Sequence, residues 1–339
     1  MGKGLDRESA QVSAMMEAIE RVSAERVDRP IAMRPFSTMR DGVPCAIDPR
    51  AFDLPDDSSY AEDRPISWID GWDLLRGEAV WVPLDAVITP PVDGILRDVD
   101  TNGLASGNTV LEAVVHGLCE VIERDALGIL QFTSLFADAD EALPDGRRID
   151  PGSLPAEGRE WVERLRASGL QIETTLLESD IGVAVCQSVI LDGEYPSTVE
   201  ADPRRFVGLG ASPNAAVAAV RSIMEAVQSR LAIIQGARDS FNTLSGASRR
   251  STAKRPLRDI EARSRVSLDD VPTFVSDDLL DDLEYLLGRL SDAGFERAIV
   301  IDLTRRDFGV PVVRVRVPGL TSFAVNRRRV GWRCLRYLL

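Results

Sequence analysis

Residues 113–124 read AVVHGLCEVIER, and two other parts of the chain read almost the same way. Residues 10–21 are AQVSAMMEAIER, and residues 218–230 are AAVRSIMEAVQSR. When the three segments are aligned, their central glutamates occupy one position at near-equal intervals: Glu17, Glu120 and Glu225. Those intervals are far longer than the roughly 20–50-residue period of stacked repeat proteins. The pattern therefore indicates three equivalent elements within one compact fold.

Each of the three segments is predicted to be a helix, because it is rich in Ala, Met, Leu and Glu and its apolar residues recur at three-and-four spacing. Each follows a turn of small residues, at 2–4, 103–109 and 208–213. Asn108, Thr109 and Ser212 are good helix N-caps, and Pro213 suits a first helical position.

Between these helices the pattern changes to short strands. The predicted strands are 80–82, 171–177, 182–190, 298–303 and 310–317. A further helix is expected at 278–294, and the Ser-, Arg- and Asp-rich stretch 238–270 is expected to be a mobile loop near a ligand entrance. The irregular alternation predicts an α+β fold of mixed β-sheets, in a single domain over residues 1–339. No Walker or Gly-x-Gly-x-x-Gly sequence occurs, so neither a P-loop nor a Rossmann site is expected.

Composition excludes several classes of protein. The net charge of −14 argues against a nucleic acid partner, because an acidic chain repels phosphate backbones. Basic residues gather at 249–255 and 327–329, which we interpret as solvated loops. No stretch approaches the roughly 20 apolar residues of a membrane span, and the first residues lack a secretory signal. With four widely spaced cysteines and one histidine, a zinc site is not expected and a cytoplasmic location fits best.

The repeated glutamates suit a hard cation. Glu17 with Glu20, and Glu120 with Glu123, lie three residues apart and therefore share a helix face, while Glu225 adds a fifth carboxylate. Like-charged carboxylates in a partly buried cleft repel one another unless a cation lies between them. Magnesium takes one or two carboxylates together with water and phosphate oxygens. The five glutamates therefore predict two or more magnesium ions that hold a polyphosphate.

Arginines stand beside these glutamates in each copy, at Arg21, Arg124 and Arg230. Their guanidinium groups match phosphate geometry, so the combination is typical of a phosphoryl-transfer site. The alternative is an exposed helix face with ion pairs worth only about 0.3–0.5 kcal/mol each, and three aligned copies make that alternative weaker. His116 has two interpretations that remain open, a packed core residue or a hydrogen-bonding group beside a nucleotide. Cys119 is expected to fill core.

These segments resemble the blocks of the YcaO family. Ser13-x-x-x-Glu17-x-x-Glu20-Arg21 is similar to the family signature SxxxExxER. Residues 108–126 resemble the second block, and residues 210–239 resemble the third. The segment 317–320 is similar to the closing VPGxE motif, although Thr321 stands where the family has glutamate. The similarity runs from Lys3 to about Gly319, which is nearly the whole chain.

The resemblance implies a YcaO-like fold with the three helices around an ATP site, and a reaction in which ATP phosphorylates a backbone amide oxygen. By position it implies magnesium ligands at Glu17, Glu20, Glu120, Glu123 and Glu225. The nucleotide contacts that it implies are Lys3, Ser13, Arg21, Asn108, His116, Arg124, Gln228, Arg230 and Arg238. No catalytic residue is assigned.

Two departures from the family pattern affect the expected function. Family members usually have a strand before Gly-Lys-Gly, whereas here Met1 directly precedes Gly2, so we expect a truncated start or a missing first strand. Ring-forming cyclodehydratases of the family commonly end in a proline-rich tail, and this chain has no proline after Pro318. The second departure favours the thioamide-forming branch that is associated with TfuA proteins.

The leading hypothesis is therefore ATP-dependent thioamidation of a ribosomally made peptide or a protein, together with a TfuA-like partner. One alternative is an azoline-forming cyclodehydratase, in which a Cys, Ser or Thr of the substrate is the nucleophile. Another is an ATP-binding accessory factor of a ribosomal-protein methylthiotransferase. The sequence does not decide between a monomer and a homodimer.

Overall fold

The computed structural model describes residues 1–97, 100–136, 146–194, 205–236 and 264–338. The chain forms two compact units. One unit comprises Met1–Met15 and Thr133–Val275, and the other comprises Met16–Phe132 and Ser276–Leu339. We call them the first and the second unit.

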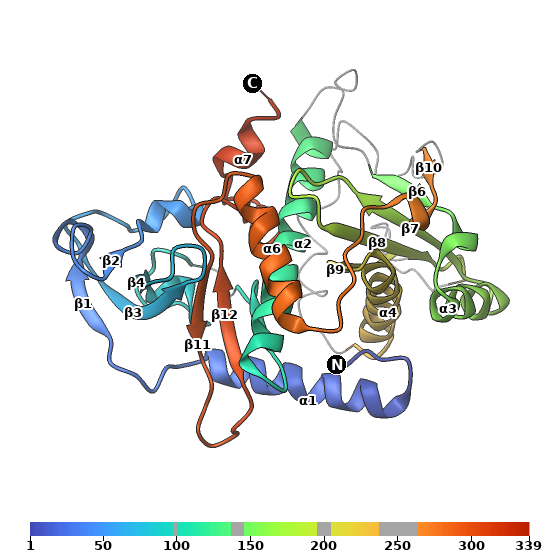
Figure 1. The fold of residues 1–339 in the computed structure, drawn as a ribbon, viewed down its shortest axis with the longest axis horizontal. Coiled ribbons are helices and arrows are strands. Elements are labelled where there is room, and N and C mark those ends of the chain that lie inside the picture. The colour runs from blue at the N-terminus through green and yellow to red at the C-terminus, as the bar shows by residue number, and fades with distance from the viewer. Residues whose placement is uncertain (98–99, 137–145, 195–204, 237–263, 339) are drawn as a thin grey trace. The chain divides into compact units, whose positions relative to one another are not determined.

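The second unit contains a mixed sheet (Figure 1). Its strands are β1 (Ala32–Pro35), β2 (Cys45–Ala46), β3 (Pro65–Asp73), β4 (Glu78–Pro83), β5 (Leu104–Ser106), β11 (Ile299–Asp302) and β12 (Val312–Arg316). Their order is β2-β4-β3-β11-β12-β5, and β1 also pairs with β3. The pair β2–β4 is parallel and the other pairs are antiparallel. The core against this sheet includes Trp68, which is fully buried and donates its indole N–H to Arg34 O at 2.9 Å.

Helices and short 3-10 turns complete this unit. The helices are α1 (Arg7–Ala24) and α2 (Val110–Phe136), which each continue from one unit into the other, and α6 (Leu279–Asp292) and α7 (Trp332–Leu335). The 3-10 turns are η1 (Phe36–Thr38), η2 (Pro49–Phe52) and η3 (Leu84–Ala86).

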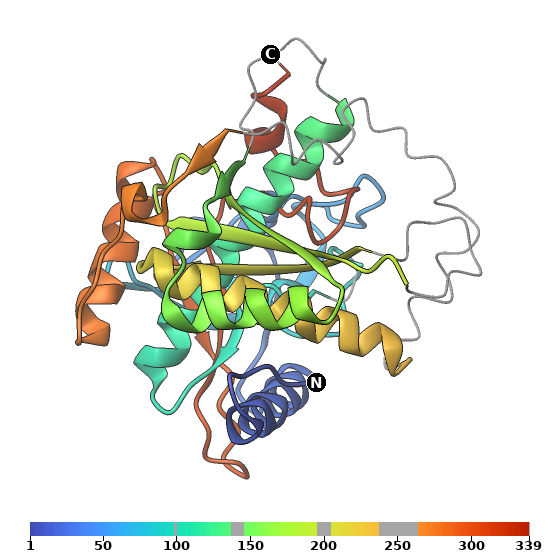
Figure 2. The same cartoon turned by 90° about the vertical axis from the view of Figure 1, so that its right-hand side faces the viewer.

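The first unit is built on a second mixed sheet, with the order β10-β6-β7-β8-β9. Its strands are β6 (Arg147–Ile149), β7 (Gln171–Leu177), β8 (Ala184–Leu191), β9 (Arg205–Ser212) and β10 (Arg265–Val266). Figure 2 shows α3 (Ala156–Ala167) and α4 (Ala215–Ile234) packed on one face of this sheet. The turns η4 (Pro151–Ser153) and η6 (Leu268–Asp270) also belong to this unit.

The α+β class with mixed sheets, predicted from the sequence, is confirmed, and all three repeated segments are helical, in α1, α2 and α4. The predicted start of α4 is wrong. Asn214 is the N-cap and accepts a hydrogen bond from Ala216 N, whereas Ser212 still belongs to β9. Of the expected loop 238–270, residues 265–266 and 268–270 form β10 and η6, and residues 238–263 lie outside the described part.

Small residues on β9 let the strand and α4 touch backbone to backbone. A Cβ on Gly208 would lie 2.0 Å from Ala226 N and 2.3 Å from Ser222 O of the helix. A Cβ on Gly210 would lie 2.3 Å from Ala218 O. The glycines that precede the third repeat are therefore required by this close packing, which fixes the position of α4 on its sheet.

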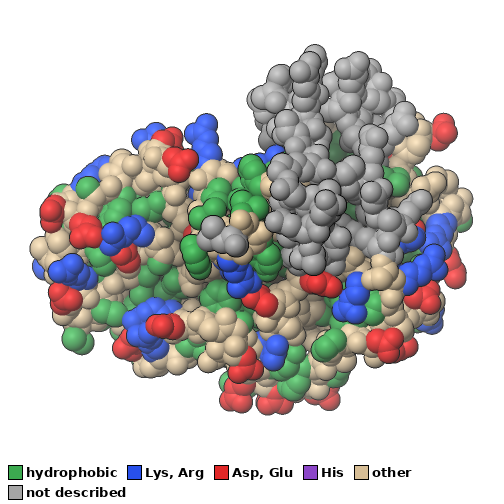
Figure 3. Space-filling view, turned by 90° about the horizontal axis from the view of Figure 1, so that it is seen from above, with side chains coloured by type: hydrophobic (Ala, Val, Ile, Leu, Met, Phe, Trp, Pro, Cys, Tyr) green, Lys and Arg blue, Asp and Glu red, His purple; other side chains and the backbone are tan. Residues whose placement is uncertain are grey.

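The surface carries both signs of charge. In the space-filling view of Figure 3, basic and acidic side chains are interspersed over the described part of that face. No helix among the described residues is both long enough and apolar enough to cross a membrane. None of the four cysteines, all of which are described, forms a disulfide.

We predict that Gly208→Ala destabilises the protein by about 1–3 kcal/mol or more, because the methyl group overlaps backbone atoms of α4. The matched control is Gly288→Ala in α6, where an added Cβ meets no atom within 4 Å. The control should be neutral or stabilising by up to about 1 kcal/mol, since alanine favours the helix. Urea denaturation of both variants measures the difference. Equal stabilities would contradict the packing argument.

Candidate functional site

Strand β5 holds the carboxylate of Glu20, which comes from α1. Ser106 donates twice to Glu20 Oε1, from its backbone N at 2.8 Å and from its Oγ at 2.6 Å. Burial raises the pKa of Glu20 above its usual range, and the hydrogen bonds from Ser106 oppose that rise. The second oxygen, Oε2, accepts no hydrogen bond from any residue in the described ranges.

The residue just before β5 holds the carboxylate of Glu120. Gly103 N donates to Glu120 Oε2 at 3.1 Å. Gly103 has a φ of 71°, and a Cβ there would lie 2.2 Å from Val315 O, so only glycine fits. Gly117 lets α2 approach β12 one turn before the glutamate, because a Cβ there would lie 2.7 Å from Val315 Cγ2. Segment 103–106 thus holds Glu20 at one end and Glu120 at the other.

Basic side chains lie close to three of the predicted glutamates in the second unit. Arg124 Nη2 is 3.8 Å from Glu120 Oε1 and 3.6 Å from Glu123 Oε1, and the Glu123 side chain is only 9% exposed. Arg21 Nη2 is 2.8 Å from Glu17 Oε1, in a largely exposed pair along α1. The exposed pair contributes little to stability. The half-buried pairs of Arg124 keep positive charge beside two carboxylates.

Asn108 precedes α2, and His116 lies within that helix. Thr109 Oγ1 caps the helix by accepting from Glu112 N at 3.1 Å, and Glu112 Oε2 accepts from Asn108 N at 2.8 Å. This is a variant of the capping box, in which the glutamate accepts from the residue before the N-cap, so the bonds that Asn108 makes serve the helix start. His116 is half-buried one turn before Glu120. Cys119 is buried, as expected.

In the first unit, four of the predicted residues come together. Lys3 Nζ is 2.5 Å from Glu225 Oε2, and Lys3 N donates to Ser13 Oγ at 3.2 Å. Gln228 donates its side-chain amide to Met1 O. The N-terminal segment therefore joins the start of α1 to the glutamate of α4 within this unit.

Arg230 has a different partner. Its Nε and Nη2 donate to Asp192 Oδ2 at 3.0 and 2.6 Å, and Asp192 is 4% exposed. The guanidinium also lies 6.0 Å from the ring centroid of Phe206. Arg230 is thus engaged in a partly buried ion pair. Arg238 lies outside the described residues.

The carboxylates described above fit a magnesium ion that the protein and a nucleotide would bind together. Among the residues that the structure describes, no three or more His, Cys, Asp and Glu side chains are grouped closely enough to hold a metal alone. Magnesium commonly binds one or two carboxylates and completes its shell with water and phosphate oxygens. Glu20 and Glu120, both fixed by segment 103–106, supply hard oxygen ligands of that kind.

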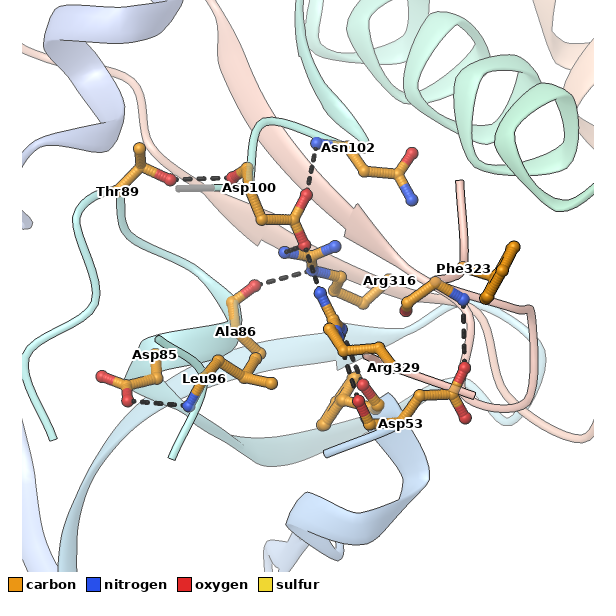
Figure 4. Close-up of polar contacts among 12 residues, drawn as sticks. Asp53, Asp85, Ala86, Thr89, Leu96, Asp100, Asn102, Arg316, Phe323 and Arg329 are labelled. Carbon is orange, nitrogen blue, oxygen red and sulfur yellow. Dashed lines mark hydrogen bonds and ion pairs between the residues drawn. The ribbon is translucent and has the colours of Figure 1, made fainter. Parts of the chain in front are cut away.

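A buried charged cluster adjoins segment 103–106 in the second unit (Figure 4). Asp100 Oδ2 accepts from Arg316 and Arg329, each at 3.1 Å. Arg329 is buried, so the interpretation of 327–329 as a solvated loop is wrong for this residue. Burial alone would raise the pKa of Asp100, but the guanidinium groups, Arg316 and Arg314 foremost, hold it well below its usual range. Asp100 Oδ1 accepts from Asn102 N at 2.8 Å, so the cluster fixes the backbone directly before Gly103.

The closing segment is fixed to α2 by a second buried pair. Asp125 is fully buried, and its Oδ1 accepts from Thr321 N at 2.8 Å and from Arg333 Nε at 2.7 Å. Thr321, which replaces the glutamate of the family motif, therefore anchors its segment through its backbone.

Sequence reasoning missed the two residues that donate to the glutamates, Gly103 and Ser106, and the buried charged cluster around Asp100. The small-residue turn 103–109 was recognised only as a helix entry. A usable signal was the charge within the apolar strand VVRVRV at 312–317, because charged residues inside such a strand need buried partners.

Comparison with known proteins gives close relatives along nearly the whole chain. A family model described as YcaO cyclodehydratase, ATP- and Mg2+-binding, matches residues 1–321. A protein of Methanothermobacter thermautotrophicus is 35% identical over 98% of this chain and 84% of its own length. A protein of Rhizobium leguminosarum bv. trifolii, described as lying in the tfuA 3′ region, is 34% identical over 94% of this chain and 76% of its own length.

Comparison with solved structures finds the same fold. YcaO from Methanopyrus kandleri, bound with AMPPCP and Mg2+, matches with a TM-score of 0.74 and 28% identity, over 97% of this chain and 81% of that one. A heterocyclase in complex with substrate and cofactor shares the fold, with a TM-score of 0.75 and 21% identity over 95% of this chain and 45% of that one.

Asp53 gives the buried cluster a testable pH dependence. Its Oδ2 accepts from Ser322 N at 3.0 Å, and its φ of 50° is one that asparagine also tolerates. Burial raises the pKa of Asp53 from 3.8 to about 6, against the hydrogen bond from Ser322 and the charge of Arg329. The folded protein therefore holds this proton more tightly than the unfolded chain does. The stability that Asp53 contributes is largest at low pH and is lost as the pH rises to about 6.

We predict that Asp53→Asn, which cannot ionise but still accepts from Ser322 N, gains stability relative to the wild type as the pH rises from 4 to 7. The gain should reach about 2–3 kcal/mol, at 1.36 kcal/mol for each unit of pKa difference. Urea denaturation of both proteins at several pH values checks this. A difference in unfolding free energy that does not change with pH would contradict the assignment.

Proposed function

The chain belongs to the YcaO family, and on that premise we propose that it uses ATP and Mg2+ to phosphorylate, and thereby activate, a backbone amide of a peptide or protein. The observation that carries the proposal is the anchoring of two glutamates from separate repeats, Glu20 and Glu120, by segment 103–106. Both carboxylates belong to helices that align as copies of the sequence repeat.

In the proposed site, acidic residues bind the metal and basic or polar residues bind the nucleotide. Glu20 and Glu120, with Glu17 and Glu123 on the same helices, would hold Mg2+, which supplies Lewis-acid polarisation of phosphate oxygens when bound. Glu225, which lies beside Lys3, is the proposed magnesium ligand of the third repeat. Outer-sphere donors fix the rotamers of the acids before any ligand arrives, as Ser106 does for Glu20.

Nucleotide contacts are proposed for basic and polar residues on or next to the same helices. They are Lys3, Ser13, Arg21, Asn108, His116, Arg124, Gln228, Arg230 and Arg238. Lys3 and Arg124 support this most directly, since Lys3 lies beside Glu225 of the third repeat and Arg124 lies beside Glu120 of its own helix. Arg230 would have to leave Asp192 to reach a nucleotide.

Such a site would activate an amide carbonyl for attack by a nucleophile. An amide carbonyl is a poor electrophile, and transfer of a phosphoryl group to its oxygen creates a leaving group for a nucleophile to displace. Positioning and charge stabilisation supply most of the catalysis in phosphoryl transfer. An arrangement of fixed carboxylates and nearby guanidinium groups supports that kind of catalysis.

We further propose that the nucleophile is a sulfide equivalent delivered with a TfuA-like partner, which gives a thioamide. The relative described by its place in the tfuA 3′ region supports this choice. The second candidate is azoline formation by a Cys, Ser or Thr of the substrate, and it is supported by the cyclodehydratase description of the family. Mass spectrometry separates the two, because exchange of oxygen for sulfur raises the peptide mass and loss of water lowers it.

We predict that Glu120→Gln abolishes Mg2+-dependent ATP turnover while the protein stays folded, because the neutral amide no longer attracts the cation. The half-buried position keeps one acceptor oxygen for Gly103 N, so the fold should be retained. The measurement is phosphate release with Mg2+ and ATP in the presence of peptide substrate, alongside circular dichroism. The matched control is Glu284→Gln, an exposed glutamate of α6. Unchanged turnover in Glu120→Gln would remove the metal assignment.

A further inference from the structure

Arg314 is the most completely buried charged residue near the glutamate anchors. It lies on β12 opposite Leu104 of β5, and its exposure is 0%. Its side chain makes no ion pair of 4 Å or less with a carboxylate among the described residues. A buried guanidinium without a direct counter-ion is costly, so its retention needs an explanation.

The hydrogen bonds of Arg314 show what the side chain holds in place. Nη1 donates to Asn102 O at 3.0 Å, and Nη2 donates to Asp100 O at 2.9 Å. Nε donates to Val87 O at 2.9 Å, and Nη2 also reaches Thr89 Oγ1 at 3.2 Å. The planar fork therefore binds residues 100–102 to the segment 87–89.

Those bonds end directly before the residues that anchor the glutamates. Asn102 precedes Gly103, whose N–H donates to Glu120. Gly103 O accepts from Val315 N of β12, the strand that also carries Arg314, at 2.7 Å. A shift of Asn102 O would therefore turn the peptide that carries the Gly103 N–H. A lysine could not replace this fork, because its single nitrogen cannot face three carbonyl groups in one plane.

Charge points to the same pair of glutamates. Burial lowers the pKa of Arg314 to about 9, together with Arg316, whereas Asp100, Glu120 and Glu20 oppose the decrease. After Asp100, the carboxylates whose charges stabilise this cation are therefore the two that segment 103–106 anchors.

We propose that Arg314 is a positioning residue for the magnesium site: it fixes residues 100–102 so that the N–H groups of Gly103 and Ser106 hold Glu120 and Glu20 in the geometry that binds the metal. This inference rests on the proposed function, since it assumes that these glutamates bind a divalent cation. It adds a residue that touches neither metal nor nucleotide.

The test measures metal affinity rather than turnover. Mn2+ replaces Mg2+ as an ion visible to electron paramagnetic resonance, and the full chain is titrated with AMPPCP present. Arg314→Lys should weaken Mn2+ binding by about 10–100-fold, the range typical for lost outer-sphere partners of a metal ligand. The titration is run well below the melting temperature of each variant, so a loss of stability alone leaves the affinity unchanged.

The matched control is Arg297→Lys. Arg297 pairs with the fully buried Asp73 in the same unit, at 2.7 Å, and makes no hydrogen bond to residues 100–106 in the described chain. The Arg297→Lys variant should have a lower melting temperature than the wild type and the same Mn2+ affinity. Equal affinity in Arg314→Lys and the wild type would overturn the inference. A wild type that binds no Mn2+ with AMPPCP would instead overturn the proposed function.

A milder variant keeps the test decisive if Arg314→Lys does not fold. Thr89→Val removes the hydroxyl that accepts from Arg314 and donates to Asp100 O at 2.8 Å. It should weaken Mn2+ binding in the same direction by a smaller factor. Wild-type affinity in folded Thr89→Val would overturn the inference.

Discussion

The central constraint on this molecule is the cost of taking ionised carboxylates out of water. Each acid that comes out of water needs hydrogen-bond donors or positive charge to remain ionised. The protein meets that need with backbone N–H groups on segment 103–106 and with basic residues one turn away along the helices. A glycine with a positive φ and a serine with two donors are therefore as necessary to the site as the glutamates themselves.

Much of the fold follows from local sequence. The repeated helices were recognisable because their composition and spacing favour helix, and β7 was predicted at its observed bounds because it alternates and ends at clear turns. Ser212 misled the prediction of a helix start, since β9 runs on to that residue and Asn214 takes the cap instead. Local preference does not distinguish two good caps that lie two residues apart.

The candidate glutamates stand out in the sequence, and the residues that donate hydrogen bonds to them do not. Glu20 meets Ser106 and Arg314 meets Asn102 only through the tertiary fold, and a single sequence does not print such pairs. Arg230 shows the limit in the other direction. The repeat assigns it to a phosphate, yet Asp192, far away in sequence, holds its guanidinium in the structure.

Segment 103–106 also has a consequence for how the chain acquires its structure during synthesis. Ser106 is 86 residues from its partner Glu20, and Asn102 is 212 residues from Arg314. Contacts of such high sequence separation form late, since long loops must close first. Domains emerge from the ribosome N-terminus first, so β12 is among the last strands to appear. Residues 100–102 would therefore lack the hydrogen bonds from Arg314 until most of the chain has been synthesised, so the peptide that carries the Gly103 N–H would reach its final geometry late.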